Sequence, residues 1–345
     1  MIKNYIKLIF ELFFLLIMLI CLCGNKLLIY GISQAKGQLT IIIHSQPVEE
    51  ILQDELFVDS LKQKLRLIVE LKQFVIDSIG INPSDNYSTF YNQRNKPILY
   101  TITACQPYSF IPKEWSFPFL GAVPYKGFFN KKEAEKEVLS LKIQGYDVDL
   151  YSPSGWSTLG WLNDPILSNM LYKSEGQLAN LIIHELTHGT IYIKNNVTFN
   201  ENLANFIGDK GAEKFLQYKF GLESKQYIYY KQSKMDEKCF TDYMIKSKKQ
   251  LDSLYHSMSA MNEDTLKNTL KNKLIMEIVL GVNRLPLFKK KNYFQYSLIA
   301  FVEKNSFFMA FDRYDSQFEV FDIEYRSIFK SNLRNYFNFL KEKFN

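Results

Sequence analysis

The sequence predicts a predominantly helical α+β protein, and three patterns along the chain indicate this fold class. Residues 48–79 carry apolar side chains at helical spacing. Residues 99–104 and 147–151 alternate between apolar and polar side chains, as expected of strands. Residues 231–272 are polar and lysine-rich, with the character of two helices. We therefore expect a small sheet accompanied by many helices.

The composition is that of one folded protein rather than a disordered chain. The 345 residues are 47% hydrophobic and 15% aromatic, which is enough apolar material to bury a substantial core. The net charge of +6 comes mainly from the stretches 231–273 and 289–291, which are most simply solvated helix faces and a turn. Basic residues interleaved with stacking aromatics are not found, so we expect no nucleic-acid partner.

Residues 1–26 have the pattern of a membrane-targeting leader. Lys3 and Lys7 precede a nearly unbroken apolar run that ends at Cys23. A secretory signal and a signal anchor both fit this pattern. The run lacks an Ala-x-Ala cleavage site, and about 20 residues suffice to span a bilayer, so we favour an uncleaved transmembrane anchor. Residues 27–345 would then lie on the exported, periplasmic side of the cell membrane.

The leader contains two of the four cysteines, which leaves Cys105 and Cys239. An exported location permits a disulfide between them, and the sequence alone does not decide whether it forms.

The remaining elements of the N-terminal half follow in order. Residues 39–43 fit either a helix or a strand. Between the two expected strands, residues 131–144 form a helix that Gly145 stops. Residues 154–161 then form a loop, which either lines a cleft or is a turn anchored by buried tryptophans.

The segment His-Glu-Leu-Thr-His at residues 184–188 carries the most specific chemical signal. Ser174 and Gln177 form a capping box that begins a helix, so the motif lies on a helix. Residues four apart differ by roughly 40° around a helix, so His184 and His188 project from one face and can bind one ion. Glu185 stands beside that ion as a general base, the pattern of a zinc hydrolase. The competing interpretation is a pair of hydrogen-bonded core histidines, which gives Glu185 no purpose on an apolar helix.

A third metal ligand is expected, because catalytic zinc usually has three protein ligands. Residues 199–207 have the pattern of an amphipathic helix with Asn200 as its cap, whose first turn can bring Glu201 to the histidine face. Asn205, one turn later, could orient a histidine ligand. Two alternatives remain: either Glu201 only stabilises its helix dipole, or His256 is the third ligand.

Residues 225–275 are expected to form a polar helical hairpin, broken near residues 261–264. Such a hairpin is either a lid or arm over the site or a solvated pair of helices.

Several blocks of the sequence together resemble a known family. They are residues 31–39, 115–118 with 124–129, 145–148, 156–161 with 164–165, and 184–204. The family is the predicted aminopeptidases of Gram-negative bacteria, membrane-anchored or lipoprotein-type proteins of the gluzincin class of zinc peptidases. The likeness extends over most of the chain. The leader departs from the lipobox of many relatives, since Leu22 rather than a small residue precedes Cys23.

The resemblance implies roles for particular residues. It makes His184, His188 and Glu201 the ligands of a single Zn²⁺ and Glu185 the base, and it favours a helix at residues 39–43.

The resemblance also relates residues 283–285 and Tyr293 to a motif region that follows the helical hairpin in relatives. On that ground Tyr293 and Arg284 are candidate catalytic residues, as donors that stabilise the oxyanion. The alternative is that Arg284 forms a surface ion pair and Tyr293 fills the core.

These patterns predict one zinc-peptidase domain at residues 27–345, with a small sheet beside the active-site helix that grips an extended peptide. Zinc would activate a water molecule, and Glu185 would take its proton and pass it to the departing amine. We expect an exported, membrane-anchored aminopeptidase that acts on peptides or proteins. A zinc endopeptidase and a non-catalytic, zinc-stabilised envelope protein remain alternatives.

Overall fold

The computed structural model describes residues 27, 29–117, 121–153, 163–194, 196–313 and 318–344. The leader expected at residues 1–26 and the loop expected at 154–161 lie outside the described residues. Helices predominate and the sheets are small, so the expected α+β class is confirmed. None of the helices in the described ranges is long and apolar enough to cross a membrane.

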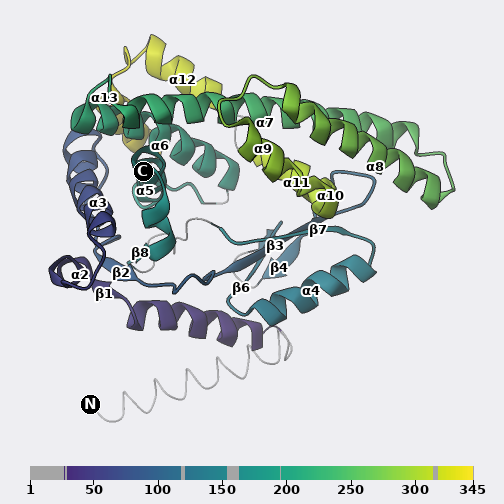
Figure 1. Ribbon diagram of the computed structural model, residues 1–345, viewed down its shortest axis with the longest axis horizontal. Coiled ribbons are helices and arrows are strands. Elements are labelled where there is room, and N and C mark those ends of the chain that lie inside the picture. The colour runs from purple at the N-terminus through teal and green to yellow at the C-terminus, as the bar shows by residue number, and fades with distance from the viewer. Residues whose placement is uncertain are drawn as a thin grey trace.

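The described chain begins with a helix at residues 29–43, which confirms a helix rather than a strand at 39–43. It packs beside the sheet region at the bottom of Figure 1, where Tyr30 Oη donates to the carbonyl of Gly127 at 2.7 Å. Gly37 lies against the ring of Phe129, and a Cβ at Gly37 would stand only 2.1 Å from that ring. The glycine is therefore required for this close approach.

The single helix expected at residues 48–79 is interrupted. The structure has α2 at Val48–Gln53 and α3 at Asp59–Ser78. Between them the chain turns so that Phe57 packs edge-on against Phe90, with ring centroids 5.4 Å apart. Burial of this aromatic pair therefore accompanies the break that helical periodicity did not reveal.

The expected strands and their intervening helix are confirmed. Strand β3 pairs antiparallel with both of its neighbours, and helix α4 packs on the sheet that they form. Gly145 ends the turn after α4 with a φ of 85°. The elements are β3 Tyr100–Cys105, β6 Lys126–Phe128, α4 Lys131–Ile143 and β7 Asp147–Tyr151. The remaining short strands are β1 Gln46–Pro47, β2 Thr89–Tyr91, β4 Trp115–Phe117, β5 Gly121–Val123 and β8 Ile166–Leu167.

Helices α5 and α6 cross closely in the largest apolar cluster of the described chain. A Cβ at Gly208 of α6 would lie 3.0 Å from the carbonyl oxygen of Asn180, and one at Gly211 would lie 2.8 Å from Ile183 Cδ1. Only glycine leaves room for the facing helix at these positions. The cluster is built mainly from α3, α5 Glu175–His188, α6 Val197–Phe220, α12 Phe318–Ser327 and α13 Leu333–Phe344.

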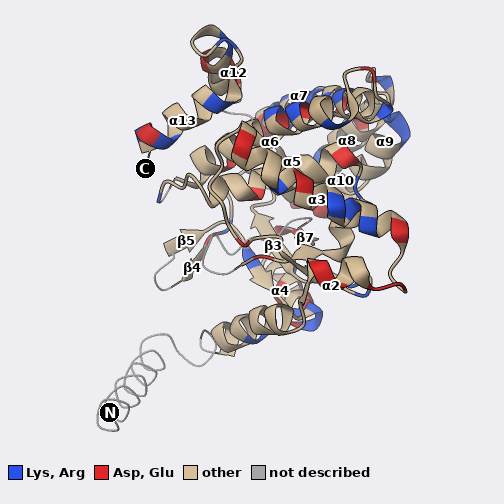
Figure 2. Cartoon of the chain, turned by 90° about the vertical axis from the view of Figure 1, so that its left-hand side faces the viewer, with Lys and Arg blue, Asp and Glu red and all other residues tan. Residues whose placement is uncertain are grey.

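The expected helical hairpin is present and extends further than expected, as α7 Lys225–Ser257 and α8 Asp264–Gly281. Figure 2 shows basic residues interspersed with acidic ones along α7, in keeping with a solvated outer face. The inner face is different, because Phe240, Met244 and Ile275 are fully buried in a second apolar cluster. The hairpin is therefore half of a packed layer, completed by α9 Lys290–Ser297, α10 Ala300–Glu303 and α11 Asn305–Met309.

The base of the hairpin is tied to α6 by a polar cluster. The Lys234 ammonium lies 2.9 Å from the Asp209 carboxylate, which also accepts from Tyr230 Oη at 3.2 Å. Asn180 of α5 donates to the same tyrosine at 3.0 Å. Three helices thus meet at one point.

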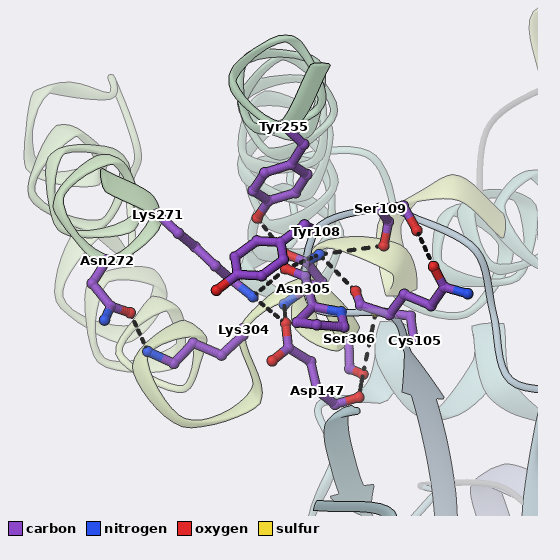
Figure 3. A network of polar contacts seen from close by, with 12 residues as sticks. Cys105, Tyr108, Ser109, Asp147, Tyr255, Lys271, Asn272, Lys304, Asn305 and Ser306 are labelled. Carbon is purple, nitrogen blue, oxygen red and sulfur yellow. Dashed lines mark hydrogen bonds and ion pairs between the residues drawn. The ribbon is translucent and has the colours of Figure 1, made fainter. Parts of the chain in front are cut away.

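The far end of the hairpin is tied to the sheet by a buried network, which we call the joint (Figure 3). Lys271 of α8 is 2% exposed and donates to the Asp147 carboxylate and, at 2.6 Å, to the carbonyl of Pro107. The backbone N–H of Asn305 donates to the same carboxylate at 3.1 Å, and Tyr255 Oη donates to Asn305 Oδ1 at 2.5 Å. Helices α7, α8 and α11 are thereby joined to the start of β7.

Burial works against the charges in the joint. It lowers the pKa of Lys271 and raises that of Asp147, although each charge favours ionisation of the other. The cost of burying the two charges therefore offsets much of their attraction, so the ion pair itself adds little to the stability of the fold. Removing one partner alone would leave a charge buried without compensation.

Lys271→Met should lower the free energy of unfolding by about 3–5 kcal/mol, because it leaves the Asp147 carboxylate buried without its ion-pair partner. The double variant Lys271→Met/Asp147→Asn should recover part of that loss, since both charges are then gone. Lys273→Met, an exposed lysine on the same helix, is the control and should change the value by no more than about 0.5 kcal/mol. Denaturant unfolding followed by circular dichroism measures all three. Equal effects of Lys271→Met and Lys273→Met would contradict the role of the joint.

Candidate metal centre

Helix α5 begins at the expected capping box. The Ser174 side chain accepts from the backbone of Gln177, whose own side chain returns to the Ser174 backbone. The helix ends at His188, with Gly189 as its C-cap, so both motif histidines lie in its last two turns. The chain after it, residues 190–194, has no regular secondary structure.

The start of α6 differs from the expectation. The helix begins at Val197, and its cap is Asn196, whose side chain accepts from Phe199 N at 3.1 Å. Asn200, expected to be the cap, lies inside the first turn and is 2% exposed. Its side chain accepts from Ile193 N at 2.9 Å and donates to Ile193 O at 2.8 Å. Asn200 therefore fixes the loop between the helices, and this sets the position of the neighbouring Glu201.

The three expected metal ligands converge. His184 Nε2 and His188 Nε2 are 3.2 Å apart, and they lie 3.6 and 3.4 Å from the two carboxylate oxygens of Glu201. Ligand atoms around a tetrahedral zinc ion, each about 2.0–2.1 Å from it, would be separated by about 3.3 Å. Among the described residues, this His, His, Glu group has the spacing and the donor chemistry to hold one such ion.

The two histidines have opposite electrostatic environments. Burial and the neighbouring His184 lower the pKa of His188 to about 4, against the attraction of Glu201. Burial alone would also lower the pKa of His184, but the hydrogen bond to Glu201 and the charges of Glu185 and Glu201 outweigh it and raise that pKa. His188 is therefore neutral at physiological pH, the form in which histidine binds metal.

A residue beyond the ligands lies near His184. The side chain of Asn205, one turn after Glu201 on α6, contributes to the raised pKa of His184, so it is placed where it could orient the ring as the sequence suggested. Asn205 Nδ2 is buried and has no hydrogen-bond partner among the described residues. His188 Nδ1 is likewise buried without a described partner.

Glu185 lies next to the ligands in sequence but outside the converging group. Burial raises the pKa of its carboxyl to about 7; His184 opposes the shift, whereas the negative charges of Glu201 and Asp164 add to it. A carboxyl group that titrates near neutrality can both accept and return a proton.

Sequence reasoning missed the segment that lies against the end of α5. Asn82 N donates to Thr190 Oγ1 at 3.1 Å. Tyr87 N donates to the carbonyl of Asp164 at 2.7 Å, and Asp164 N donates to Asn86 Oδ1 at 2.9 Å. In the sequence, Asp164 stood out only as a member of one of the blocks that carry the family resemblance. No pattern around Tyr87 predicted that its segment lies near the candidate metal centre.

The two candidate oxyanion donors lie elsewhere. Tyr293, on α9, packs against Phe240 in the second apolar cluster, with ring centroids 4.8 Å apart. Arg284 is exposed after α8, close enough to Tyr243 to influence that phenol. No contact among the described residues joins Tyr293 or Arg284 to a metal ligand. The catalytic role of these two residues stays a prediction.

The disulfide that the sequence left open is not formed, since Cys105 and Cys239 are both free thiols.

Asn205→Ala should weaken zinc affinity about 10- to 100-fold, because His184 would lose the group that orients its ring. Competition with a chromophoric chelator measures the affinity. Asn283→Ala, at an exposed position after α8, is the matched control and should bind zinc as the wild type does. Unchanged affinity in Asn205→Ala would show that the Asn205 side chain does not support the site.

Searches of curated proteins and of solved structures find no significant match to this chain. A family model does match, over residues 29–343, which is nearly the whole chain; the family is described as "Putative aminopeptidase". The match includes the helix at 29–43, the metal-centre helices and the hairpin. The chain therefore belongs to this aminopeptidase family.

Proposed function

We propose that the protein is a zinc-dependent peptidase that releases residues from the N-termini of peptides. The observation that carries the proposal is the convergence of His184, His188 and Glu201 with the carboxyl group of Glu185 beside them. Membership of the aminopeptidase family supports a peptidase activity.

His184, His188 and Glu201 would hold the ion. Zinc, when bound, supplies a Lewis acid that polarises the scissile carbonyl and makes a water molecule acidic near neutral pH. Glu185 takes the proton of the attacking water and donates it to the departing amine. With its pKa raised to about 7, Glu185 exchanges that proton at little cost in both steps.

The donor set supports catalysis over a purely structural zinc site. Structural zinc is usually enclosed by four protein ligands, whereas the metal-binding group among the described residues has three members. The Glu201 side chain is 36% exposed, so the group is open to solvent on that side. A structural site would also have no use for Glu185.

Glu185→Gln should retain zinc and lose peptidase activity by about 10²–10⁴-fold in kcat, because the amide cannot accept the proton of the attacking water. Zinc content is measured by atomic absorption. Activity is measured on a peptide library that is prepared once with free N-termini and once with blocked N-termini. Glu201→Gln is the contrasting variant and should lose zinc.

The library also distinguishes the classes of peptidase. Cleavage restricted to free N-termini supports an aminopeptidase, and cleavage of blocked peptides indicates an endopeptidase. Full activity of Glu185→Gln, or zinc binding without cleavage of any peptide, would contradict the proposed function.

We also propose that residues 1–26 anchor the enzyme in the cell membrane with the catalytic domain on the exported side. The support is the sequence pattern of Lys3 and Lys7 before an apolar run. The full chain should remain in the membrane fraction after carbonate extraction, and protease added to the exported face should digest it. Release of the full chain by carbonate would contradict the anchor.

A further inference from the structure

The helix at residues 29–43 lies at the outer edge of the molecule, at the bottom of Figure 1, and its outer face is apolar. The inner face packs against the sheet region through Tyr30 and Gly37. A solvated helix normally carries polar side chains on its other face, but four apolar side chains there are 55–72% exposed. They are Ile29, Ile32, Leu39 and Ile43. Their spacing of three, seven and four residues aligns them along one side of the helix.

Helix α4 lies beside this helix and exposes apolar side chains in the same direction. Ser33 Oγ donates to Glu133 Oε2 of α4 at 3.3 Å, so the two helices are neighbours. Tyr30 packs in the same apolar cluster as Leu141 of α4, on one face of the sheet. Both helices therefore cover that face, and their outer faces point away from it. On the outer face of α4, Leu139 and Ile143 are 60% and 78% exposed.

Lysines accompany these apolar side chains. Lys36 lies within the row on the first helix, and Lys132 and Lys136 lie on the same side of α4 as Leu139; all three lysines are exposed. Residues 29–43 contain no aspartate or glutamate.

The glutamates of α4 have partners of their own. Glu133 accepts from Ser33, Glu135 is paired with Lys131, and Glu137 is paired with Lys126. The exposed apolar side chains and lysines of the two helices, which we call the lower face, therefore form a surface that is both apolar and basic.

The lower face has the pattern of a helix that lies in a membrane interface, with apolar side chains on one side and lysines around them. Residues 29–43 are too few to cross a bilayer, and the inner face is already packed on the protein. The helix begins three residues after the proposed anchor at residues 1–26. Three residues span at most about 11 Å. An anchored chain therefore holds this helix within reach of the bilayer surface.

We propose that the lower face docks on an anionic membrane surface, with the helix at residues 29–43 parallel to the bilayer plane. The apolar side chains enter the boundary between headgroups and acyl chains, and the lysines bind lipid phosphates. Lys36 can do so from within the apolar row, because its long stem lets the ammonium reach the headgroups. Docking fixes the orientation of the enzyme, which an anchor alone leaves free to rotate. It builds on the proposed anchor and is independent of the peptidase activity.

A second copy of the chain fits the lower face less well. The three- and four-residue spacing around Lys36 would also suit the seam of a coiled coil. Four side chains on one short helix, however, supply well under the about 800 Å² per partner that a stable interface takes. Leu139 and Ile143 of α4 would also lie outside such a seam. A membrane surface covers both helices at once.

The test places a tryptophan on the lower face. Leu39→Trp in the full chain is incorporated into vesicles of phosphatidylethanolamine and phosphatidylglycerol with brominated acyl chains, which quench tryptophan that enters the bilayer. The emission of the three native tryptophans is subtracted with the wild type. Met235→Trp is the control, at a 70% exposed position of α7 at the top of Figure 1. The added emission of Leu39→Trp should be quenched at least about two-fold more strongly.

Ile43→Trp, one turn further along the same row, repeats the measurement and should also be quenched. Equal quenching of the lower-face and Met235→Trp variants would overturn the proposal. So would a dimer in detergent that Ile32→Asn/Leu39→Asn dissociates, if the lower-face tryptophans are not quenched, because that result assigns the face to a second copy.

The charge of the lipid is tested in the Leu39→Trp background. Lys36→Gln/Lys136→Gln should reduce quenching in anionic vesicles, because each lysine strengthens docking about 5-fold there. Lys246→Gln/Lys249→Gln, at exposed positions of α7, is the matched control and should leave quenching unchanged. Vesicles of phosphatidylcholine alone should also reduce quenching. Equal quenching in the two lipids would contradict an anionic surface.

Carbonate extraction of the same samples separates docking from the anchor. Quenching of Leu39→Trp in a chain that carbonate releases supports the lower face and contradicts the anchor. Retention of the chain without quenching overturns the lower face and leaves the anchor in place. Neither result depends on the cleavage of a peptide.

Discussion

The close crossing of α5 and α6 is the constraint on which the candidate site depends. The two histidines lie on one helix and Glu201 on the other, so their ligand atoms meet only if the helix axes approach closely. Gly208 and Gly211 allow this approach, because a Cβ at either position would meet the facing helix. The Asn200 side chain is hydrogen-bonded to the backbone of Ile193 in the loop between the two helices. These bonds fix the position of the neighbouring Glu201 relative to α5. Backbone packing, rather than the ligands themselves, sets the geometry.

Much of the site was predictable because its determinants are local in sequence. The capping box at Ser174, the four-residue spacing of the histidines and the turn from Glu201 to Asn205 all follow from helix geometry. Strands β3 and β7 were predictable from alternation for the same reason. The cap of α6 was not, since Asn196 and Asn200 are equally suitable by residue type, and only the contact of Asn200 with Ile193 distinguishes them.

Features that depend on contacts between distant segments were not predictable. The break between α2 and α3 accompanies the packing of Phe57 on Phe90, and the left-handed backbone of Tyr87 accompanies hydrogen bonds with Asp164. The apolar inner face of the hairpin was also missed. Its buried residues on α7, Phe240, Met244, Leu251 and Tyr255, have helical spacing, but the many lysines between them make the segment polar on average. In each case a tertiary contact overrides or hides the local pattern.

The base of the hairpin is held at Asp209 and its far end at Lys271, and this double attachment has a mechanical consequence. A lid needs one free end, so that it can rotate about a hinge. A helix pair supported at both ends behaves as a beam, which resists rotation and yields only by slight bending. The hairpin is thus a strut that holds the helical layer and the sheet at a set separation. Adjustment to substrates of different size would then fall to the loops between elements rather than to this helix pair.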